Sequence, residues 1–222
     1  MNDVAGMTQE VPASAKARNI LEAARALFIA RGYEAASMDA VAKAANVSKA
    51  TVYAYFNSKN ELFAAIVARM ADGLTREIGA VMEAGLPLDE ALTAIGGRFL
   101  GVLTDPDRVR MFRMMVAEVD RFPELGRVFY RSGPLVMCDC LARYLEHATA
   151  AGLLAVPDPA LAARQFLSLI KGDLHLRCLF NVGIVPAPSD RDRQVTAAVD
   201  MFLKAYGAPN VSRVQREARS AS

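Results

Sequence analysis

The segment from Ser37 to Lys59, SMDAVAKAANVSKATVYAYFNSK, constrains the fold of this chain more than any other stretch. Apolar residues recur at helical spacing on both sides of Asn46-Val47, so the segment is expected to form two short helices. The break falls at Asn46 because asparagine enters the left-handed backbone conformation at low cost, and a tight turn between helices needs such a residue. Ser37 and Ser48 stand where the two helices would begin and can cap them. The sequence therefore predicts a helix-turn-helix unit.

The outer face of the second helix is unusual for a solvated surface. Val52 and Phe56 lie four residues apart and are expected to face inward, whereas residues 43–59 contain three lysines and no acid. Lysines and tyrosine hydroxyls can bind phosphates, and Thr51 can bond to a base edge. Such a surface suits a polyanion, and its chemistry is that of helix-turn-helix proteins that bind DNA. The alternative is a solvated helical hairpin whose charges happen to be lysines.

Several short runs of residues in and around this segment form a pattern together. They are Ile20-Leu21, Ala24 to Phe28, Gly32-Tyr33, Val41-Ala42, Val47-Ser48-Lys49, Thr51 to Phe56, Lys59 and Leu62-Phe63. In this combination, over about residues 14 to 65, the chain resembles TetR-type transcriptional regulators. The resemblance implies a double-stranded DNA operator as partner and a Lys59 that contacts phosphate at a helix start. The DNA-binding residues that it implies are Ser37, Ser48, Lys49, Ala50, Thr51, Tyr53, Tyr55 and Lys59.

The composition agrees with a folded protein but does not by itself indicate a partner. The chain has 222 residues, 53% of them hydrophobic, and a formal net charge of +2 from 26 basic and 24 acidic residues. This balance hides where the charges sit, so only the local lysine run indicates nucleic acid. The sequence has no apolar run of membrane-spanning length, and the first residues, MNDVAGMTQEVPAS, do not have the pattern of a secretory peptide. We therefore expect a cytoplasmic protein without a membrane partner.

The cysteines and histidines do not form a recognisable chemical site. Cys138, Cys140 and Cys178 are too few for a disulfide framework and lack a second pair to close a zinc site, so reduced thiols packed as small hydrophobes are favoured over redox sensing by Cys138 or Cys140. His147 and His175 have no partner nearby in sequence. We expect no cofactor, no metal and no enzymatic activity, because nucleophile-base, metal-ligand and phosphate-loop patterns are absent from the sequence. A helical carrier or enzyme without DNA binding, or a pure interaction module, are the alternatives.

The rest of the chain predicts further helices around the opening motif, about nine in all. Residues 1–13 and 207–222 are expected to be tails, residues 14–62 a three-helix DNA-binding domain, and residues 63–206 a helical domain for effector binding and dimerisation. A capping box at Ser58 and Glu61 starts a long helix to about Met82, which would carry shifts of the second domain to the DNA-binding domain. The segment AEVDRFPELGRVFYRSGP, together with Gly172-Asp173, resembles the C-terminal half of the AefR-like branch of TetR regulators. The fold class is therefore expected to be all-α.

Two sites are predicted in the second domain. Large or pliable apolar residues would hold a small apolar effector, although a methionine stripe such as Met111, Met114 and Met115 is more often plain core. Leu161 to Phe180 is expected to form one helix, apolar on nearly all sides, that pairs with the last helix and with a second copy; a fully buried helix in a monomer is the alternative. Asp173, an acid amid apolar residues, would be exposed in a kink or would contact a pocket. The predicted pocket residues are Phe99, Leu103, Met111, Met115, Phe129, Cys138, Phe166 and Ile170, and the predicted homodimer residues are Leu167, Leu174, Val195, Val199 and Phe202.

Overall fold

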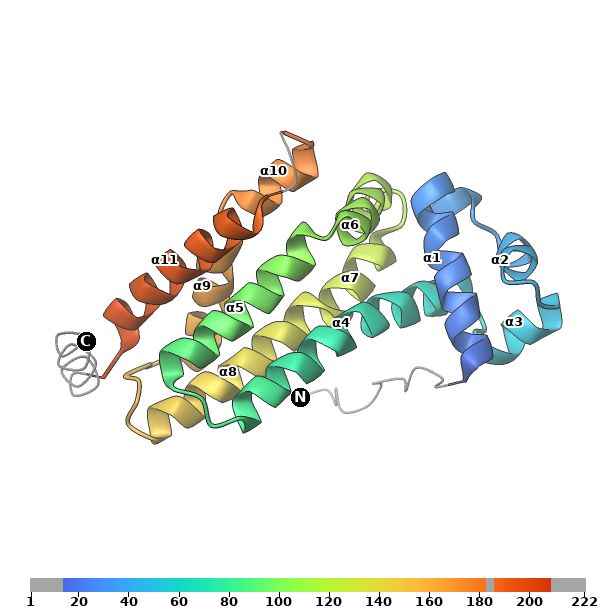
Figure 1. Cartoon of the computed structure of the whole chain (residues 1–222). Helices are drawn as coiled ribbons and strands as arrows, with labels where there is room; N and C mark the ends of the chain where they lie inside the picture. Colours follow the sequence, from blue (N-terminus) through green and yellow to red (C-terminus); the bar gives the residue numbers. More distant parts are fainter. Residues whose placement is uncertain (1–13, 183–185, 209–222) are drawn as a thin grey trace. The chain divides into compact units, whose positions relative to one another are not determined.

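A computed structural model describes residues 14–182 and 186–208, which form eleven helices and no sheet (Figure 1). The all-α prediction is confirmed. Of the predicted tails 1–13 and 207–222, only residues 207–208 are among the described residues. These two are not a free tail, because Gly207 forms a backbone bridge with Leu154 and the N–H of Ala208 donates to the carbonyl of Leu153 at 3.2 Å. Within the described segments no helix has the length and hydropathy of a membrane span. The helices are α1 (Ala15–Ala35), α2 (Met38–Ala44), α3 (Lys49–Tyr55), α4 (Lys59–Glu83), α5 (Leu88–Thr104), α6 (Pro106–Glu118), α7 (Pro123–Ser132), α8 (Pro134–Ala150), α9 (Pro159–Lys171), α10 (Leu174–Phe180) and α11 (Pro188–Tyr206).

The chain divides into two compact units that are not contiguous in sequence. The head unit comprises residues 14–71 and 110–133, and the body unit comprises the described residues of 72–109 and 134–208. The α6–α7 hairpin, which was expected in the second domain, groups with the three N-terminal helices in the head unit. The chain therefore passes between the units at three places, within α4, within α6, and between α7 and α8.

Aromatic rings form the centre of the head unit's core. The ring of Phe28 lies 5.4 Å from that of Tyr33 and 6.0 Å from that of Phe63, measured between centroids. Phe28, Tyr33 and Phe63 are at most 2% exposed, and burial of side chains of this size is a main source of folding free energy. The methionines of α6 belong to the same core, which also contains Leu125 of α7.

Helix α6 turns its methionines toward the head unit's core. Met111, Met114 and Met115 are 0%, 8% and 6% exposed, so the interpretation of these methionines as core is confirmed. Val116 of the same helix is 51% exposed. Unbranched methionines fit the irregular gap that remains.

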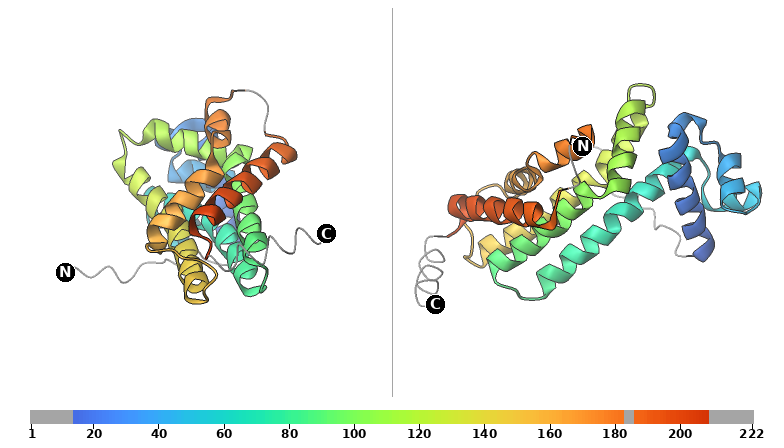
Figure 2. Two further views of the ribbon diagram at one scale, coloured as in Figure 1. Left: turned by 90° about the vertical axis from the view of Figure 1, so that its left-hand side faces the viewer. Right: turned by 45° about the horizontal axis from the view of Figure 1, so that its top comes forward.

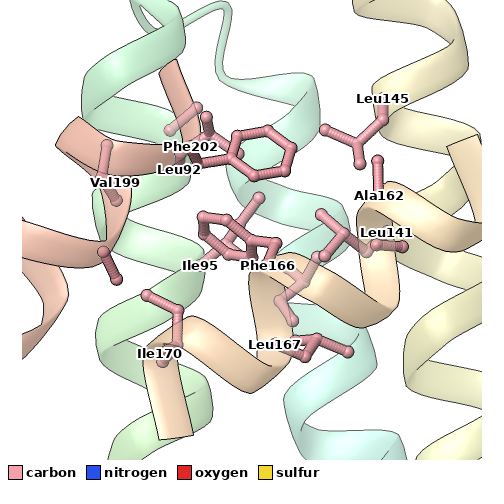
Figure 3. Packing of buried hydrophobic residues seen from close by; sticks show 14 of the residues in the cluster. Leu92, Ile95, Leu141, Leu145, Ala162, Phe166, Leu167, Ile170, Val199 and Phe202 are labelled. Atoms are coloured by element: carbon pink, nitrogen blue, oxygen red, sulfur yellow. The ribbon is translucent and has the colours of Figure 1, made fainter. Parts of the chain in front are cut away.

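The body unit is a helical bundle with α9 at its centre. Helix α9 is in direct contact with α5, α8 and α11, and the views of Figure 2 show α5, α9 and α11 side by side. The rings of Phe166 on α9 and Phe202 on α11 meet edge to face with centroids 5.1 Å apart. Figure 3 shows these two rings between Leu92 and Ile95 of α5 and Leu145 of α8.

The prediction of one helix from Leu161 to Phe180 is wrong. Helix α9 ends at Lys171, and Gly172 takes φ 48° and ψ −144°, which a residue with a side chain rarely adopts. The side-chain amide of Gln194 on α11 donates to the carbonyl of Leu169 at 2.7 Å and so satisfies one acceptor of the last turn of α9. A separate helix, α10, begins at Leu174, so two helices stand where the sequence predicted one. Asp173, left open between kink and pocket, lies exposed in this break.

Two neighbouring glycines of α5 offer a paired test of the body unit's packing. A Cβ on Gly96 would lie 2.6 Å from Cδ1 of Ile170 and 3.2 Å from Cγ1 of Val195, whereas a Cβ on Gly97 would meet nothing within 4 Å. We expect Gly97→Ala to raise the free energy of unfolding by about 0.5–1 kcal/mol through helix propensity. Gly96→Ala should lower it by about 1–2 kcal/mol, because crowding in a close-packed core exceeds that gain. Urea unfolding followed by circular dichroism measures both, and equal shifts would contradict the packing.

Candidate nucleic-acid interface

The turn between α2 and α3 is built as the sequence predicts. Ser37 accepts from the backbone N–H of Ala40, and Ser48 accepts from the N–H of Thr51, each at 3.1 Å. Asn46 takes φ 53°, in the left-handed region. The backbone N–H of Val47 then donates to the carbonyl of Ala42 at 3.0 Å and closes the turn. The predicted caps and the predicted break are confirmed.

The predicted contact residues of α3 are on its outward side. Val52 and Phe56 are 0% and 1% exposed and fix α3 to the head unit's core. Tyr53 is 42% exposed, and the backbone of α3 is flanked by small side chains that leave it accessible. Of the predicted DNA-binding residues, the exposed ones are Ser37, Ser48, Lys49, Ala50 and Tyr53, and the half-buried ones are Thr51, Tyr55 and Lys59. The hydroxyls of Ser48 and Thr51 also lie 2.8 Å apart, so the two side chains steady each other.

Helix α1 holds the turn through a residue that the sequence did not single out. The side-chain amide of Asn19 donates to the carbonyl of Ala45 at 2.7 Å, across 26 positions of sequence. This carbonyl lies at the end of α2, where intrahelical partners are lacking. The available signal was weak, an amide directly before the buried Ile20.

Lys59 has a second role besides the one expected of it. Its ammonium donates to the carbonyls of Tyr33 at 2.9 Å and Glu34 at 3.1 Å, and lies 4.3 Å from the ring centroid of Tyr33. Burial lowers the pKa of Lys59 from its usual value, with Glu34 acting in the opposite sense. Lys59 therefore ties the start of α4 to the end of α1. The predicted cap at Ser58 is found beside it, since the side chain of Ser58 accepts from the N–H of Glu61 at 3.1 Å, and the carboxylate of Glu61 accepts from the backbone N–H of Asn57 at 2.9 Å.

The same junction reaches the α6–α7 hairpin within the head unit. The hydroxyl of Tyr33 donates to the side-chain oxygen of Asn60, and its ring meets Phe122 edge to face at 5.2 Å. Arg121, in the turn before α7, pairs with the carboxylate of Glu34. Burial, and secondarily the charge of Glu124, raises the pKa of Tyr33 to about 12. One end of α1 thus connects α4 with the hairpin.

A single carboxylate lies within the predicted DNA-contacting segment. Asp39 is the one acid between Ser37 and Asn60, and its Oδ1 is 2.8 Å from Nζ of Lys49. Lys49 is the one charged residue of α3, and its ammonium also lies 6.0 Å from the ring centroid of Tyr53. The hydrogen bond and the charge of Asp39 raise the pKa of Lys49. The principal cation of α3 is therefore already paired in the free chain.

The predicted pocket residues lie in two separate cores. Phe166 and Ile170, both 0% exposed, belong to the body unit's core, with the half-buried Phe99 and Cys138 packed against it. Leu103 is also half-buried and lies near the end of α5 in the body unit. The remaining three, Met111, Met115 and Phe129, pack in or against the head unit's core.

The predicted dimer residues are enclosed in the body unit itself. Leu167, Leu174, Val195, Val199 and Phe202 are all 8% exposed or less. Side chains enclosed in this way have little surface to offer a second copy. The exposed apolar residues of the same region are instead Leu161 on α9, Leu176 and Phe180 on α10, and Met201 on α11.

The cysteines and histidines occupy packing positions. All three cysteines are free thiols, with Cys140 buried and the other two half-buried, and burial raises the pKa of Cys138. Nδ1 of His175 lies 2.9 Å from the carbonyl of Leu103, and Nδ1 of His147 lies 2.7 Å from that of Arg143. Within residues 14–182 and 186–208, no three His, Cys, Asp or Glu side chains are grouped to hold a metal ion.

Capped helices at a tight turn, with an outward face of hydroxyl, phenol and amine groups, define a helix-turn-helix DNA-binding protein. Residues 20–66 match the family described as "Bacterial regulatory proteins, tetR family", and residues 90–208 match "AefR-like transcriptional repressor, C-terminal domain". The chain belongs to the TetR family of transcriptional regulators. The family and its relatives are regulators, so the protein is not an enzyme.

Solved structures resemble the chain over nearly its whole length. A TetR-family regulator from Mesorhizobium loti MAFF303099 is 30% identical with a TM-score of 0.78, covering 90% of this chain and 100% of that one. The flavonoid-responsive regulator FrrA is 39% identical with a TM-score of 0.73, covering 87% and 98% respectively.

Curated relatives match the DNA-binding part. The regulator YhgD from Bacillus subtilis is 44% identical over 71 residues, which is 32% of this chain and 37% of that protein. The transcriptional activator FasR from Mycolicibacterium smegmatis is 42% identical over 64 residues, which is 29% of each chain. The chain thus matches only about a third of the length of these two relatives.

The burial of Tyr33 predicts an alkaline loss of stability. The folded chain holds the phenol proton more tightly than the unfolded chain, because the pKa rises from 10.0 to about 12. Stability from the buried neutral phenol is present below pH 10 and is lost as the pH rises through this window. Tyr33→Phe should cost about 1 kcal/mol near pH 8 through the lost hydrogen bond and then decline less steeply above pH 10. Melting temperatures from pH 8 to 11.5 test this, with the exposed Tyr130→Phe as control; parallel curves for wild type and Tyr33→Phe would contradict it.

Proposed function

We propose that this protein is a homodimeric repressor that binds a palindromic operator and is released by a small apolar effector. The observation that carries the proposal is the outward face of α3, a short capped helix with lysine, threonine and two tyrosines and no acid. Lys49 and Thr51 are the candidates for base edges, because they stand at the start of the helix that would enter the major groove. Tyr55 and Lys59 are the candidates for phosphates. Because the proposed partner is an operator in the cell's DNA, we propose that the protein acts in the cytoplasm.

The proposed homodimer uses the exposed side of α9, α10 and α11. Leu176, Phe180 and Met201 are 53%, 71% and 58% exposed, although they stand on helices whose other sides are core. Ala197 is exposed on the same side of α11 as Met201, four residues away, and would allow close approach of a second helix. Proteins that read DNA palindromes are commonly two-fold dimers, and a self-complementary apolar patch satisfies that requirement.

The proposals of repression and of effector response are based on the body unit and on the similar proteins. The C-terminal match is to the AefR-like repressors, whereas the activator FasR is matched only over 64 residues. FrrA is described as responsive to flavonoids, which are flat and largely apolar molecules. We propose an effector of that kind in the body unit beside Phe99 and Cys138, which are half-buried against the buried Phe166 and Ile170.

The route from effector to DNA follows from the chain's three passages between the units. Helix α6 begins in the body unit and continues into the head unit, where Met111 and Met115 are buried in the core. A displacement of α6 would reach the end of α1 through the Phe122–Tyr33 ring contact and the Arg121–Glu34 ion pair. The start of α4 would follow through Lys59. An effector can change operator affinity by no more than the difference between its own binding free energies to the two conformations of the protein, typically about 1–3 kcal/mol.

Neighbouring residues of α11 separate dimerisation from folding. Met201→Asp places a charge on the exposed patch and should yield folded monomers, because association would have to desolvate the carboxylate. Phe202, 1% exposed, is the matched control, and Phe202→Asp should unfold the body unit. Sedimentation velocity at micromolar concentration, with circular dichroism, distinguishes the two. A monomeric wild type, or a Met201→Asp dimer of undiminished affinity, would contradict the proposed interface.

Gel shifts on the DNA that flanks the protein's own gene test the function directly. The wild type should retard this duplex more strongly than a random duplex of equal length. Tyr53→Ala, which changes an exposed ring of α3, should weaken binding at least about tenfold. Tyr130→Ala, which changes a ring 55% exposed on α7, should have no effect. A flavonoid that releases the duplex should itself bind less tightly in the presence of the duplex by the same factor, and identical affinities would show that the body unit is no switch.

A further inference from the structure

The pairing of Lys49 with Asp39 bears directly on the strength of DNA binding. Both side chains are well exposed, 60% for Lys49 and 64% for Asp39, so neither is forced into contact by burial. The contact is nevertheless close, with Nζ and Oδ1 at 2.8 Å. It joins the first turn of α2 to the first residue of α3, the two helix starts of the motif. The carboxylate therefore occupies the position on Lys49 that an anionic oxygen of DNA would take.

We infer that Asp39 is an internal competitor for DNA, a carboxylate that stands in for phosphate on Lys49 and thereby lowers operator affinity. This inference rests on the proposed DNA binding. An ammonium that is neutralised by its own chain brings no net charge to the duplex, so Lys49 contributes less counterion release than an unpaired lysine. When Lys49 turns to the DNA, Asp39 is left unpaired beside a polyanion.

Two alternative roles for Asp39 predict different results. An acid in the first turn of a helix interacts favourably with the helix dipole, so the first role is to stabilise α2 alone. Ser37 already caps that helix, however, and the carboxylate of Asp39 is directed to Lys49. The second role is to hold Lys49 in the orientation that reads a base, since an ammonium has three donors and can bond to both. In that case removal of the carboxylate would weaken operator binding.

The competition has a thermodynamic signature that involves Lys49. On a DNA site that Lys49 contacts, binding must first break the Lys49–Asp39 pair, so removal of Asp39 increases the binding free energy by the full cost of breaking that pair. On a DNA site where Lys49 stays paired with Asp39, the increase is no larger than this cost. Asp39→Asn should therefore strengthen binding to the operator at least as much as binding to random DNA. The gain should be clearly smaller when Lys49 is absent, because the competition acts through that side chain and only the repulsion between Asp39 and DNA remains.

The experiment measures the affinity of the full-length protein for two probes, the duplex from beside its own gene and a random duplex, between about 50 and 200 mM salt. Asp39→Asn should bind the first probe several-fold more tightly, up to about tenfold at 0.1 M salt, and steepen the slope of log K against log salt by about one. In a Lys49→Met background the same substitution should give a clearly smaller gain, because only the repulsion between the unpaired carboxylate and DNA is then relieved. Glu22→Gln is the control for loss of a carboxylate elsewhere in the head unit, where Glu22 pairs with Arg25 and Arg69. Circular dichroism verifies folding, and Asp39→Ser serves as a second variant.

Each outcome bears on the inference. Weaker operator binding by Asp39→Asn would show that the carboxylate orients Lys49 and would overturn competition. A gain that stays undiminished with Lys49→Met, or that Glu22→Gln reproduces, would show a general field effect and would also overturn it. Unchanged affinity in Asp39→Asn would leave the carboxylate only a structural role. Failure of the wild type to bind either probe would refute the proposed function as well, whereas binding by the wild type without the expected gain refutes this inference alone.

Discussion

The stability of the head unit depends on how the backbone carbonyls at the end of α1 are hydrogen-bonded. Gly32 takes φ 81° and ψ 167° and bends the last turn, so the carbonyls of Tyr33 and Glu34 point away from a regular helical ladder. An ammonium is well suited to this place, because it donates to two carbonyls at once and has no acceptor of its own to satisfy. Lys59 supplies it from the first residue of α4, with the Tyr33 ring beneath. The angle between α1 and α4, and with it the support of α3, therefore rests on a polar contact inside an aromatic cluster.

The α6–α7 hairpin makes this junction more than a local support. Phe122 completes the ring cluster around Tyr33, and Arg121 reaches the carboxylate of Glu34. Gly126 of α7 lies so close to Val119 that a Cβ on the glycine would be 2.7 Å from Cγ2 of the valine. Close-packed cores transmit displacements because they have few voids to absorb them. The DNA-binding motif is thus mechanically part of a larger unit, which includes the segment 110–133 far downstream in the chain.

The sequence predicted what local chemistry determines. The serine caps at Ser37, Ser48 and Ser58 and the turn at Asn46 all depend on residues within a few positions of one another, and each is found. What the sequence did not predict depends on distant partners. The sequence predicted that Phe202 would face a second copy, but it did not show that Phe166 on α9 of the same chain would cover it. A lysine on a predicted DNA surface likewise carries no sign of a carboxylate ten residues earlier.

The three passages of the chain between the units differ in stiffness, which bears on how the proposed switch would work. Helices α4 and α6 cross as continuous hydrogen-bonded backbone, so each resists bending and carries displacement along its axis. At the third passage Gly133 leaves the helical conformation, with φ −126° and ψ −85°, and the next residue, Pro134, has no backbone N–H to continue the helical hydrogen bonds. In the proposed switch, a displacement carried along either helix would therefore move the head unit as a whole and leave its core intact. The residues of α3 would then change their spacing from a second copy while keeping their chemistry, which is what release from a palindrome requires.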